Sequence, residues 1–312
     1  MKLALIDDHR PAVTVGDRVH DLSSVLPELM AVPGRLRMTA LIERWDDYAP
    51  RLREAMRSGA TRALADVSLR APVPRPGKLL CAQLSFREGV ADAVIEPAFF
   101  LKSPCSVIGP GDVVELSTVD AAVFHHEAEL AVVIGRRAKA VSARDAMSHV
   151  FGYTCFLDLS ARGVGPGTSF QDKSYDTFGP MGPWILTAEE IPDPHALTVR
   201  LWVDGALRHN YPMSDSGAPI AQMIARASEI STLEPGDVIA LGVNHQGLGP
   251  IQDGETLRIE IEPIGGFEVR VSDPLKRRWP KSVDHAAAAW VKSHVARTPG
   301  LGPPTWAERL DR

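Results

Sequence analysis

The segment FHHEAELAVVIG, residues 124–135, gives the clearest indication of both architecture and chemistry. Residues two apart on a β-strand point to the same face, so Glu127 and Glu129 are expected to stand side by side, about 6.6 Å apart along the backbone. The apolar run Leu130–Ile134 predicts a buried strand, which places both carboxylates at the rim of a core. Like charges this close need a positive charge between them or a protonated partner. The pair is either a divalent-cation site or two glutamates on a solvated strand edge.

A third carboxylate lies in FGYTCFLDLSAR, residues 151–162, where Asp158 interrupts an apolar stretch. Aspartate is rarely buried without a partner. Asp158 could form an ion pair with Arg162, cap the next turn, or supply a third oxygen ligand. Three carboxylates without a thiolate would select a hard cation, so the cofactor is predicted to be Mg²⁺ or Mn²⁺.

Outward from these segments the chain is β-rich. Alternating or apolar strands are predicted over Leu79–Leu84, Val113–Leu116, residues 197–203, Leu257–Ile261 and Phe267–Val271, and Asp204-Gly205 is a strong hairpin signal. A helix with a buried apolar stripe is predicted over Pro219–Ile230. We expect a mixed α/β, mostly antiparallel domain with peripheral helices.

Composition suggests three parts. The proline-rich APVPRPG, residues 71–77, reads as an extended linker. It separates a small N-terminal domain (1–72), with a strand at Met1–Ile6 and an amphipathic helix over Thr39–Arg57, from a catalytic domain (73–276). A C-terminal extension (277–312) holds an alanine-rich segment and is expected to pack on the surface or on a partner subunit.

Charge and cysteine usage restrict the partners and the compartment. The 312 residues carry a formal charge of −5 without a basic block, which argues against nucleic acid or anionic membrane as partners. No apolar run approaches the ~20 residues of a membrane span, and a signal peptide is not expected. Three widely spaced cysteines without a CxxC motif suit a reducing cytoplasm.

Several blocks, in order, resemble the fumarylacetoacetate hydrolase family over roughly Arg75 to Pro274. They are RPGKLLC (75–81), EAELAVVIG (127–135), GYT through DLSAR (152–162), KSYDTFGPMGPW (173–184), LEPGDVI (233–239) and DGE (253–255). The resemblance implies a β-roll or sandwich catalytic domain, a Mg²⁺ or Mn²⁺ site, a homodimer, and small 2-oxo or 1,3-dicarbonyl acids as substrates. It places Glu127, Glu129 and Asp158 on the metal ligands.

The resemblance also suggests roles for two cations. Lys173 falls on the family's substrate-facing lysine, where an ammonium could stabilise developing negative charge. Arg162 falls on an arginine that could hold a substrate carboxylate, with a structural pairing to Asp158 as the alternative.

The chain departs from the family where the base should be. The family's hydrolytic members carry a His–Glu dyad in a lid that activates water; here the corresponding positions are Gly89 and Asp92. The substrate pocket also differs: the family's Gly-Thr-Pro turn is replaced by Gly242-Val243-Asn244, which leaves Val243 and Asn244 at substrate-binding positions.

Three residues could replace the missing acid or base. His125 shares strand parity with the two glutamates, His245 lies in a glycine-framed loop, and Glu88 lies in the lid segment. Each also has an ordinary structural alternative: covering a strand end, bonding a turn, or facing solvent. His126 points to the opposite face and is expected to be structural.

We therefore expect a divalent-metal-dependent hydrolase that cleaves a carbon–carbon bond in a small oxo acid, acylpyruvate- or fumarylacetoacetate-like. Two alternatives remain open at this point. The same metal-bound enolate would support a decarboxylase or an isomerase/tautomerase, and loss of the base would leave a non-catalytic metal and ligand binder.

Overall fold

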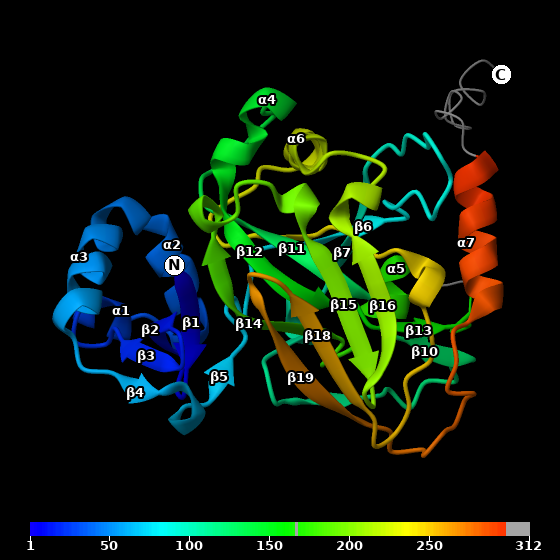
Figure 1. The fold of residues 1–312 in the computed structure, drawn as a ribbon, viewed down its shortest axis with the longest axis horizontal. Helices are drawn as coiled ribbons and strands as arrows, with labels where there is room; N and C mark the ends of the chain where they lie inside the picture. Colours follow the sequence, from blue (N-terminus) through cyan, green and yellow to red (C-terminus); the bar gives the residue numbers. More distant parts are fainter. Residues whose placement is uncertain (166–167, 298–312) are drawn as a thin grey trace.

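A computed structural model describes residues 1–165 and 168–297. The largest sheet of the described part has twelve strands. Ten of them follow the order β4-β3-β2-β1-β14-β12-β11-β17-β6-β7. Of the other two, β5 pairs with β1, and β8 pairs with β14. A five-stranded sheet, β16-β15-β18-β19-β9, and a two-stranded sheet, β10-β13, complete the β-structure of the described part. The predicted β-rich, mixed α/β class is confirmed (Figure 1).

The strands of the large sheet are β1 (Lys2–Ile6), β2 (Arg10–Val15), β3 (Arg18–Asp21), β4 (Arg62–Ala63), β5 (Leu69–Arg70), β6 (Leu79–Gln83), β7 (Ala98–Lys102), β8 (Val107–Ile108), β11 (Ala128–Ile134), β12 (Val150–Leu157), β14 (Gly179–Thr187) and β17 (Val238–Ala240). The smaller sheets contain β9 (Val113–Glu115), β10 (Val123–His125), β13 (Ser160–Arg162), β15 (Thr198–Val203), β16 (Ala206–Pro212), β18 (Thr256–Ile261) and β19 (Gly265–Ser272).

Helices cover the sheets and close the turns. The α-helices are α1 (Pro27–Met30), α2 (Arg37–Glu43), α3 (Trp45–Ser58), α4 (Ala143–Ala146), α5 (Ser169–Lys173), α6 (Ile220–Ile230) and α7 (His285–Arg297). Eight short 3-10 turns lie between them in the described ranges, of which η8 (His245–Gly247) matters for the site. No helix within these ranges is both long and apolar enough to cross a membrane.

Two predicted elements are interrupted. The helix expected over Thr39–Arg57 divides at Arg44, whose φ of −113° and ψ of 27° end α2 before α3 begins. The strand expected through residues 124–135 divides into β10 and β11, with His126 and Glu127 between them. The parity argument that linked His125 to Glu127 and Glu129 therefore does not hold, because it required an unbroken strand.

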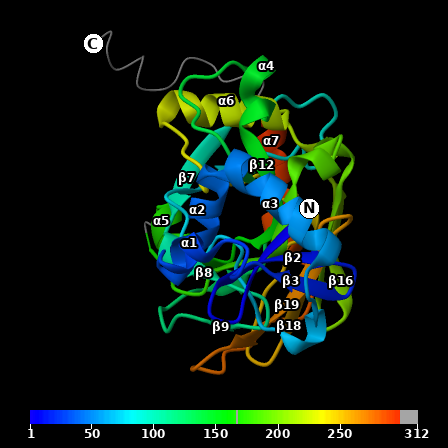
Figure 2. The ribbon, with the colours of Figure 1, turned by 90° about the vertical axis from the view of Figure 1, so that its left-hand side faces the viewer.

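The N-terminal elements lie at one end of the molecule but share its main sheet (Figures 1 and 2). β1 pairs antiparallel with β14, with Lys2 opposite Leu186 and Leu3 opposite Ile185. One apolar core combines residues from both sides of the predicted linker: Leu3, Leu5, Leu41, Tyr48, Ala131, Val133, Phe156 and Ile185 are among them. α7 lies at the opposite end of the molecule (Figure 1).

Candidate active site

Strand pairing brings the three predicted carboxylates together. β11 and β12 are antiparallel, with Ala128 opposite Leu157, so Glu127 and Asp158 flank the same end of the pair. The Asp158 N–H donates to the Glu127 carbonyl at 2.8 Å. One oxygen from each of Glu127, Glu129 and Asp158 lies within 4.8 Å of the others, and all three residues are buried.

Basic groups contact two of the three carboxylates. Lys173 Nζ, at the end of α5, lies 2.6 Å from both Glu127 Oε2 and Asp158 Oδ2. Arg162, on β13, pairs with Glu127, so the alternative that it would pair with Asp158 is wrong. The β10–β13 ladder explains this, because it brings Arg162 opposite Val123, a few residues before Glu127. Ser160 Oγ donates to Glu127 Oε1 at 2.8 Å.

Lys102 is a member of the cluster that the sequence did not indicate. Its Nζ donates to Asp158 Oδ1 at 2.7 Å and to the Leu159 carbonyl at 3.2 Å. Its side chain is fully buried at the end of β7. The only available signal was a lysine closing the apolar run Phe99–Leu101, and that pattern is equally typical of a strand end at the surface.

Glu129, unlike Glu127 and Asp158, forms no ion pair with a lysine or arginine among the described residues. Its one hydrogen bond in the described residues comes from the Gly242 N–H at 2.7 Å. Burial, and then the charge of Asp158, raise the pKa of Glu129 well above its usual value. For Glu127, burial also opposes ionisation, but the adjacent Lys173 and Arg162 outweigh it and lower the pKa.

This charge distribution fits a hard divalent cation. Buried carboxylates are normally paired with a cation or coordinate a metal, and of the three only Glu129 forms no ion pair with another described residue. The donor set is all oxygen, which suits Mg²⁺ or Mn²⁺ and not a thiolate-preferring metal. Glu127, Glu129 and Asp158 are the residues that would hold it.

Two of the candidate bases form a dyad. His245 Nδ1 lies 2.7 Å from Glu88 Oε1, although the two residues are 157 positions apart. Glu88 also accepts from the backbone N–H of His245 and, at 2.9 Å, from Gln246 Nε2. Because an ionised carboxylate only accepts, Nδ1 carries the donated proton and Nε2 is the nitrogen left to accept one. Both residues are buried.

His245 of the dyad and Glu127 of the carboxylate cluster line the same small cavity. Its volume is about 100 Å³, and it is lined by Ala82, Gln83, Leu84, Phe100, Glu127, Arg162, Ser169, Lys173, Val243 and His245. Five predicted site residues therefore surround the same space: Glu127, Arg162, Lys173, Val243 and His245. Asn244 does not line it, because its amide donates to Asp215 Oδ2 at 2.6 Å and its carbonyl caps η8 through Gln246 N.

His125 lies elsewhere. It is not among the described residues that line this cavity. Its Nε2 lies 3.1 Å from Asp284 Oδ2, just before α7. Burial, and then the charge of Arg162, lower the pKa of His125 to about 4. His126 is also buried, with Nδ1 3.0 Å from His209 Nε2, in keeping with the structural role expected for it.

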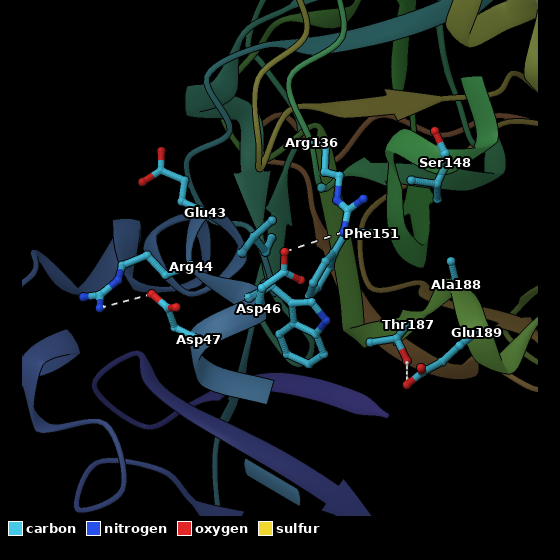
Figure 3. A pocket seen from close by; sticks show the side chains of 14 residues that line it. Glu43, Arg44, Asp46, Asp47, Arg136, Ser148, Phe151, Thr187, Ala188 and Glu189 are labelled. Carbon is cyan, nitrogen blue, oxygen red and sulfur yellow. Dashed lines mark hydrogen bonds and ion pairs between the residues drawn. The ribbon is translucent and has the colours of Figure 1, made fainter. Parts of the chain in front are cut away.

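A larger pocket, about 440 Å³, lies between the N-terminal helices and the ends of β11, β12 and β14 (Figure 3). Trp45 and Phe151 meet edge to face there with ring centroids 5.0 Å apart, and Arg136 lies 3.6 Å from Asp46. Its lining includes no predicted site residue, and two of its acidic side chains, Asp46 and Asp47, already pair with Arg136 and Arg44, so the chemistry is better placed in the smaller cavity.

Comparison with known proteins identifies relatives over most of the chain. A family model described as fumarylacetoacetate (FAA) hydrolase C-terminal matches residues 79–272. A maleylpyruvate hydrolase of Aquipseudomonas alcaligenes is 33% identical over 291 residues, covering 87% of this chain and 99% of that protein. The oxaloacetate tautomerase YisK of Bacillus subtilis is 37% identical over 218 residues, covering 65% of this chain and 72% of YisK.

Solved structures agree. A maleylpyruvate hydrolase from Sphingobium sp. SYK-6, crystallised with manganese(II) and pyruvate, superposes with a TM-score of 0.80 at 37% identity. The superposition covers 88% of this chain and 99% of that one.

Proposed function

The chain belongs to the fumarylacetoacetate hydrolase family, and from this we propose that it is a divalent-metal-dependent hydrolase that cleaves a carbon–carbon bond in a small 2-oxo acid of the acylpyruvate type. The observation that carries the proposal is one small cavity lined by Glu127 of the carboxylate cluster, the cations Arg162 and Lys173, and His245 of the His–Glu dyad. The relatives named maleylpyruvate hydrolase, one of them crystallised with manganese and pyruvate, support the substrate class and the metal.

The cations and carboxylates suit a small anionic oxo acid. A divalent cation held by Glu127, Glu129 and Asp158 would polarise the 2-oxo group and stabilise negative charge as it develops. Arg162 lines the cavity and presents a guanidinium able to bind a substrate carboxylate, in addition to its contact with Glu127. Lys173 adds a buried ammonium to the same wall.

His245 is the proposed general base, and Glu88 fixes its tautomer. Nε2 of His245 takes a proton from water as the water oxygen attacks the acyl carbonyl carbon. The bond between that carbon and the neighbouring methylene then breaks, and its electron pair passes to the pyruvate enolate. The proton held by His245 is delivered to the methylene carbon, so the products are a carboxylic acid and pyruvate.

A second candidate is an isomerase that uses the same base without water. Relatives named oxaloacetate tautomerase favour it, at 37% identity in the case of YisK. His245 would then carry a proton between carbon and oxygen of the substrate, and no carbon–carbon bond would break. Decarboxylation of a 3-oxo acid is a further variant of the same enolate chemistry. A non-catalytic binder is the weakest hypothesis, since His245 and Glu88 supply the base that it would lack.

Turnover of three substrates separates these functions. Purified protein with Mn²⁺ should release pyruvate from an acylpyruvate faster than it interconverts the enol and keto forms of oxaloacetate or releases CO₂ from it. His245→Ala should lower kcat by about 10²–10⁴, whereas His149→Ala, at a half-buried histidine that does not line the cavity, should change nothing. Turnover of oxaloacetate alone would favour the tautomerase or the decarboxylase, and unchanged kcat in the His245 variant would exclude His245 as the base.

The metal is tested independently of turnover. Mn²⁺ or Mg²⁺ should raise the melting temperature of wild-type protein and of His245→Ala, because neither lacks a proposed ligand. Glu129→Gln should remove the response, and Glu268→Gln, at an exposed position on β19, should keep it. If Glu129→Gln still responds, the ligand assignment fails. We further propose that the enzyme is a homodimer, from the family resemblance, and cytoplasmic, from its cysteine usage.

A further inference from the structure

The C-terminal segment lies outside the part of the chain that defines the family. The family model ends at residue 272, before α7 begins at His285. Yet α7 does not stand apart from the proposed site, because it packs directly against η8, the turn that begins with His245.

Asp284 connects three elements at that contact. Its backbone N–H donates to the Leu248 carbonyl, immediately after η8, at 2.7 Å. Its Oδ1 accepts from Ala287 N at 2.9 Å, as an N-terminal cap of α7 does. Its Oδ2 lies 3.1 Å from Nε2 of His125, two residues before Glu127, a close contact without hydrogen-bond geometry.

The loop that follows His245 contacts both the carboxylate-cluster segment and the C-terminal segment. His126 N–H donates to the Gly249 carbonyl at 3.3 Å from the side of the carboxylate cluster. Gly249 also lies close to the segment that leads to α7, since a Cβ added to it would lie 2.8 Å from the Ser282 carbonyl oxygen. The loop therefore lies between the metal-site strand and the C-terminal segment.

The helix itself faces inward with a regular apolar stripe. Ala288, Val291 and Val295 are buried, whereas Trp290 is 61% exposed. Lys292 also reaches the segment that carries the other half of the dyad, since its Nζ would lie 3.6 Å from a Cβ added to Gly89. α7 thus lies beside both the Glu88 segment and the His245 turn.

We propose that the Asp284 side chain is a positioning group for catalysis: by capping α7 at Ala287 and contacting His125, it fixes the main chain whose N–H binds the Leu248 carbonyl, so that the His245 turn stays against the carboxylate cluster and His245 stays paired with Glu88. The inference rests on the proposed function, in which His245 is the base. In this arrangement His125, on β10, is the residue that the Asp284 side chain contacts, and it does not act as an acid or base itself.

The test compares Asp284→Ala and Asp284→Asn in the full-length, Mn²⁺-loaded protein. Asp284→Ala should lower kcat for the acylpyruvate about 10–30-fold, leave KM and the Mn²⁺-induced rise in melting temperature unchanged, and speed amide exchange in peptides covering residues 243–250. Asp284→Asn keeps a capping oxygen and should recover most of kcat. Asp193→Ala removes a comparable side-chain cap from a short turn elsewhere and should behave as wild type.

A double variant decides whether His125 and Asp284 act together. His125→Ala should lower kcat about as much as Asp284→Ala, and the double variant should lose no more than either single one. Multiplying losses would overturn the shared role. So would wild-type kcat in Asp284→Ala, or a loss of the Mn²⁺ response together with kcat, which would indicate general disruption.

Failure of this inference is distinguishable from failure of the proposed function. If wild-type protein does not turn over the acylpyruvate, the proposed function is at fault, and amide exchange at 243–250 still reports whether Asp284 holds the turn. If Asp284→Ala does not fold, His125→Ala and Asp284→Asn carry the comparison: a normal kcat in His125→Ala overturns the proposal, and a 10–30-fold loss there with recovery in Asp284→Asn supports it.

Discussion

Asp158 is held between two buried ammonium groups, and this arrangement governs the charge of the whole site. Lys102 contacts Oδ1 and Lys173 contacts Oδ2. Lys173 also bridges to Glu127, whereas Lys102 contacts no other carboxylate in the described residues. The two lysines therefore differ in position. Lys173 lines the cavity, whereas Lys102 neutralises the charge of Asp158 without lining the cavity.

Replacing Lys102 with methionine tests this compensation, because methionine keeps the length and loses the charge. Removing one partner of a buried ion pair leaves an uncompensated charge, so the free energy of unfolding should fall by about 3–5 kcal/mol. Urea unfolding in the presence of a chelator measures it. Lys276→Met is the control, since Lys276 is largely exposed in its pair with Asp253 and should cost no more than about 1 kcal/mol. A loss that small for Lys102→Met would show that Lys173 alone suffices.

At the residue scale, the sequence predicts which side chains belong to the site better than it predicts which of them contact one another. Glu127, Glu129 and Asp158 could be proposed because carboxylates in apolar strands need an explanation, and the structure brings all three together. The Glu88–His245 contact could not, because nothing local in either segment refers to a residue 157 positions away. His125 was misplaced because parity was extended through a strand that breaks at His126.

At the scale of elements, the turn after β17 holds the site together. Gly242 has a φ of +87°, and its N–H donates to Glu129 Oε2. A Cβ at this position would lie 2.0 Å from Ser85 Oγ, in the segment that leads to Glu88. The turn therefore requires glycine for two reasons: its backbone conformation, and the close approach of the Glu88 segment to the strand end.

A comparison of Gly242→Ala with Gly254→Ala should separate the cost of the backbone conformation from the cost of the close approach. Gly254 has a φ of +83°, but a Cβ there would meet nothing within 4 Å. Backbone conformation alone should cost about 1–2 kcal/mol in both variants, and overpacking should add about 1–3 kcal/mol in Gly242→Ala only. Urea unfolding gives both values. Gly242→Ala should also weaken the Mn²⁺ response, because the donor to Glu129 moves; equal losses in the two variants would contradict the close approach.

The strands themselves were the most predictable elements. Alternation and the Asp204-Gly205 turn predict the β15–β16 hairpin, and the apolar stripe predicts α6, which begins at Ile220 after Pro219. The interruptions were not predictable in the same way. Arg44 ends α2 although the apolar spacing continues into α3, because periodicity records which face is buried and not whether the backbone is continuous.

At the scale of the whole molecule, the amino-acid composition suggests two domains, whereas the pairing of the strands joins them in one sheet. The proline-rich segment 71–77 predicts a linker between two domains, and the family model starts only at residue 79. In the structure, β1 is hydrogen-bonded to β14, and four of its residues, Leu3–Ile6, are fully buried. Sequence composition could not reveal this, because pairing between strands more than 180 residues apart leaves no local signal.

Deleting residues 1–77 tests whether the N-terminal part is separable. The deletion would leave β14 without its β1 neighbour and would uncover the apolar surface that Leu3, Leu5 and Tyr48 now cover. An unpaired, apolar strand edge promotes aggregation, so the fragment 78–312 should be insoluble or lack a cooperative melting transition. Supplying residues 1–77 as a separate polypeptide during expression should restore soluble protein, because the lost contacts are non-covalent. The opposite outcome is a soluble fragment that melts cooperatively and turns over the acylpyruvate at the wild-type kcat. It would show that residues 1–72 form an independent domain. It would also show that the shared sheet adds little to the stability of the catalytic part.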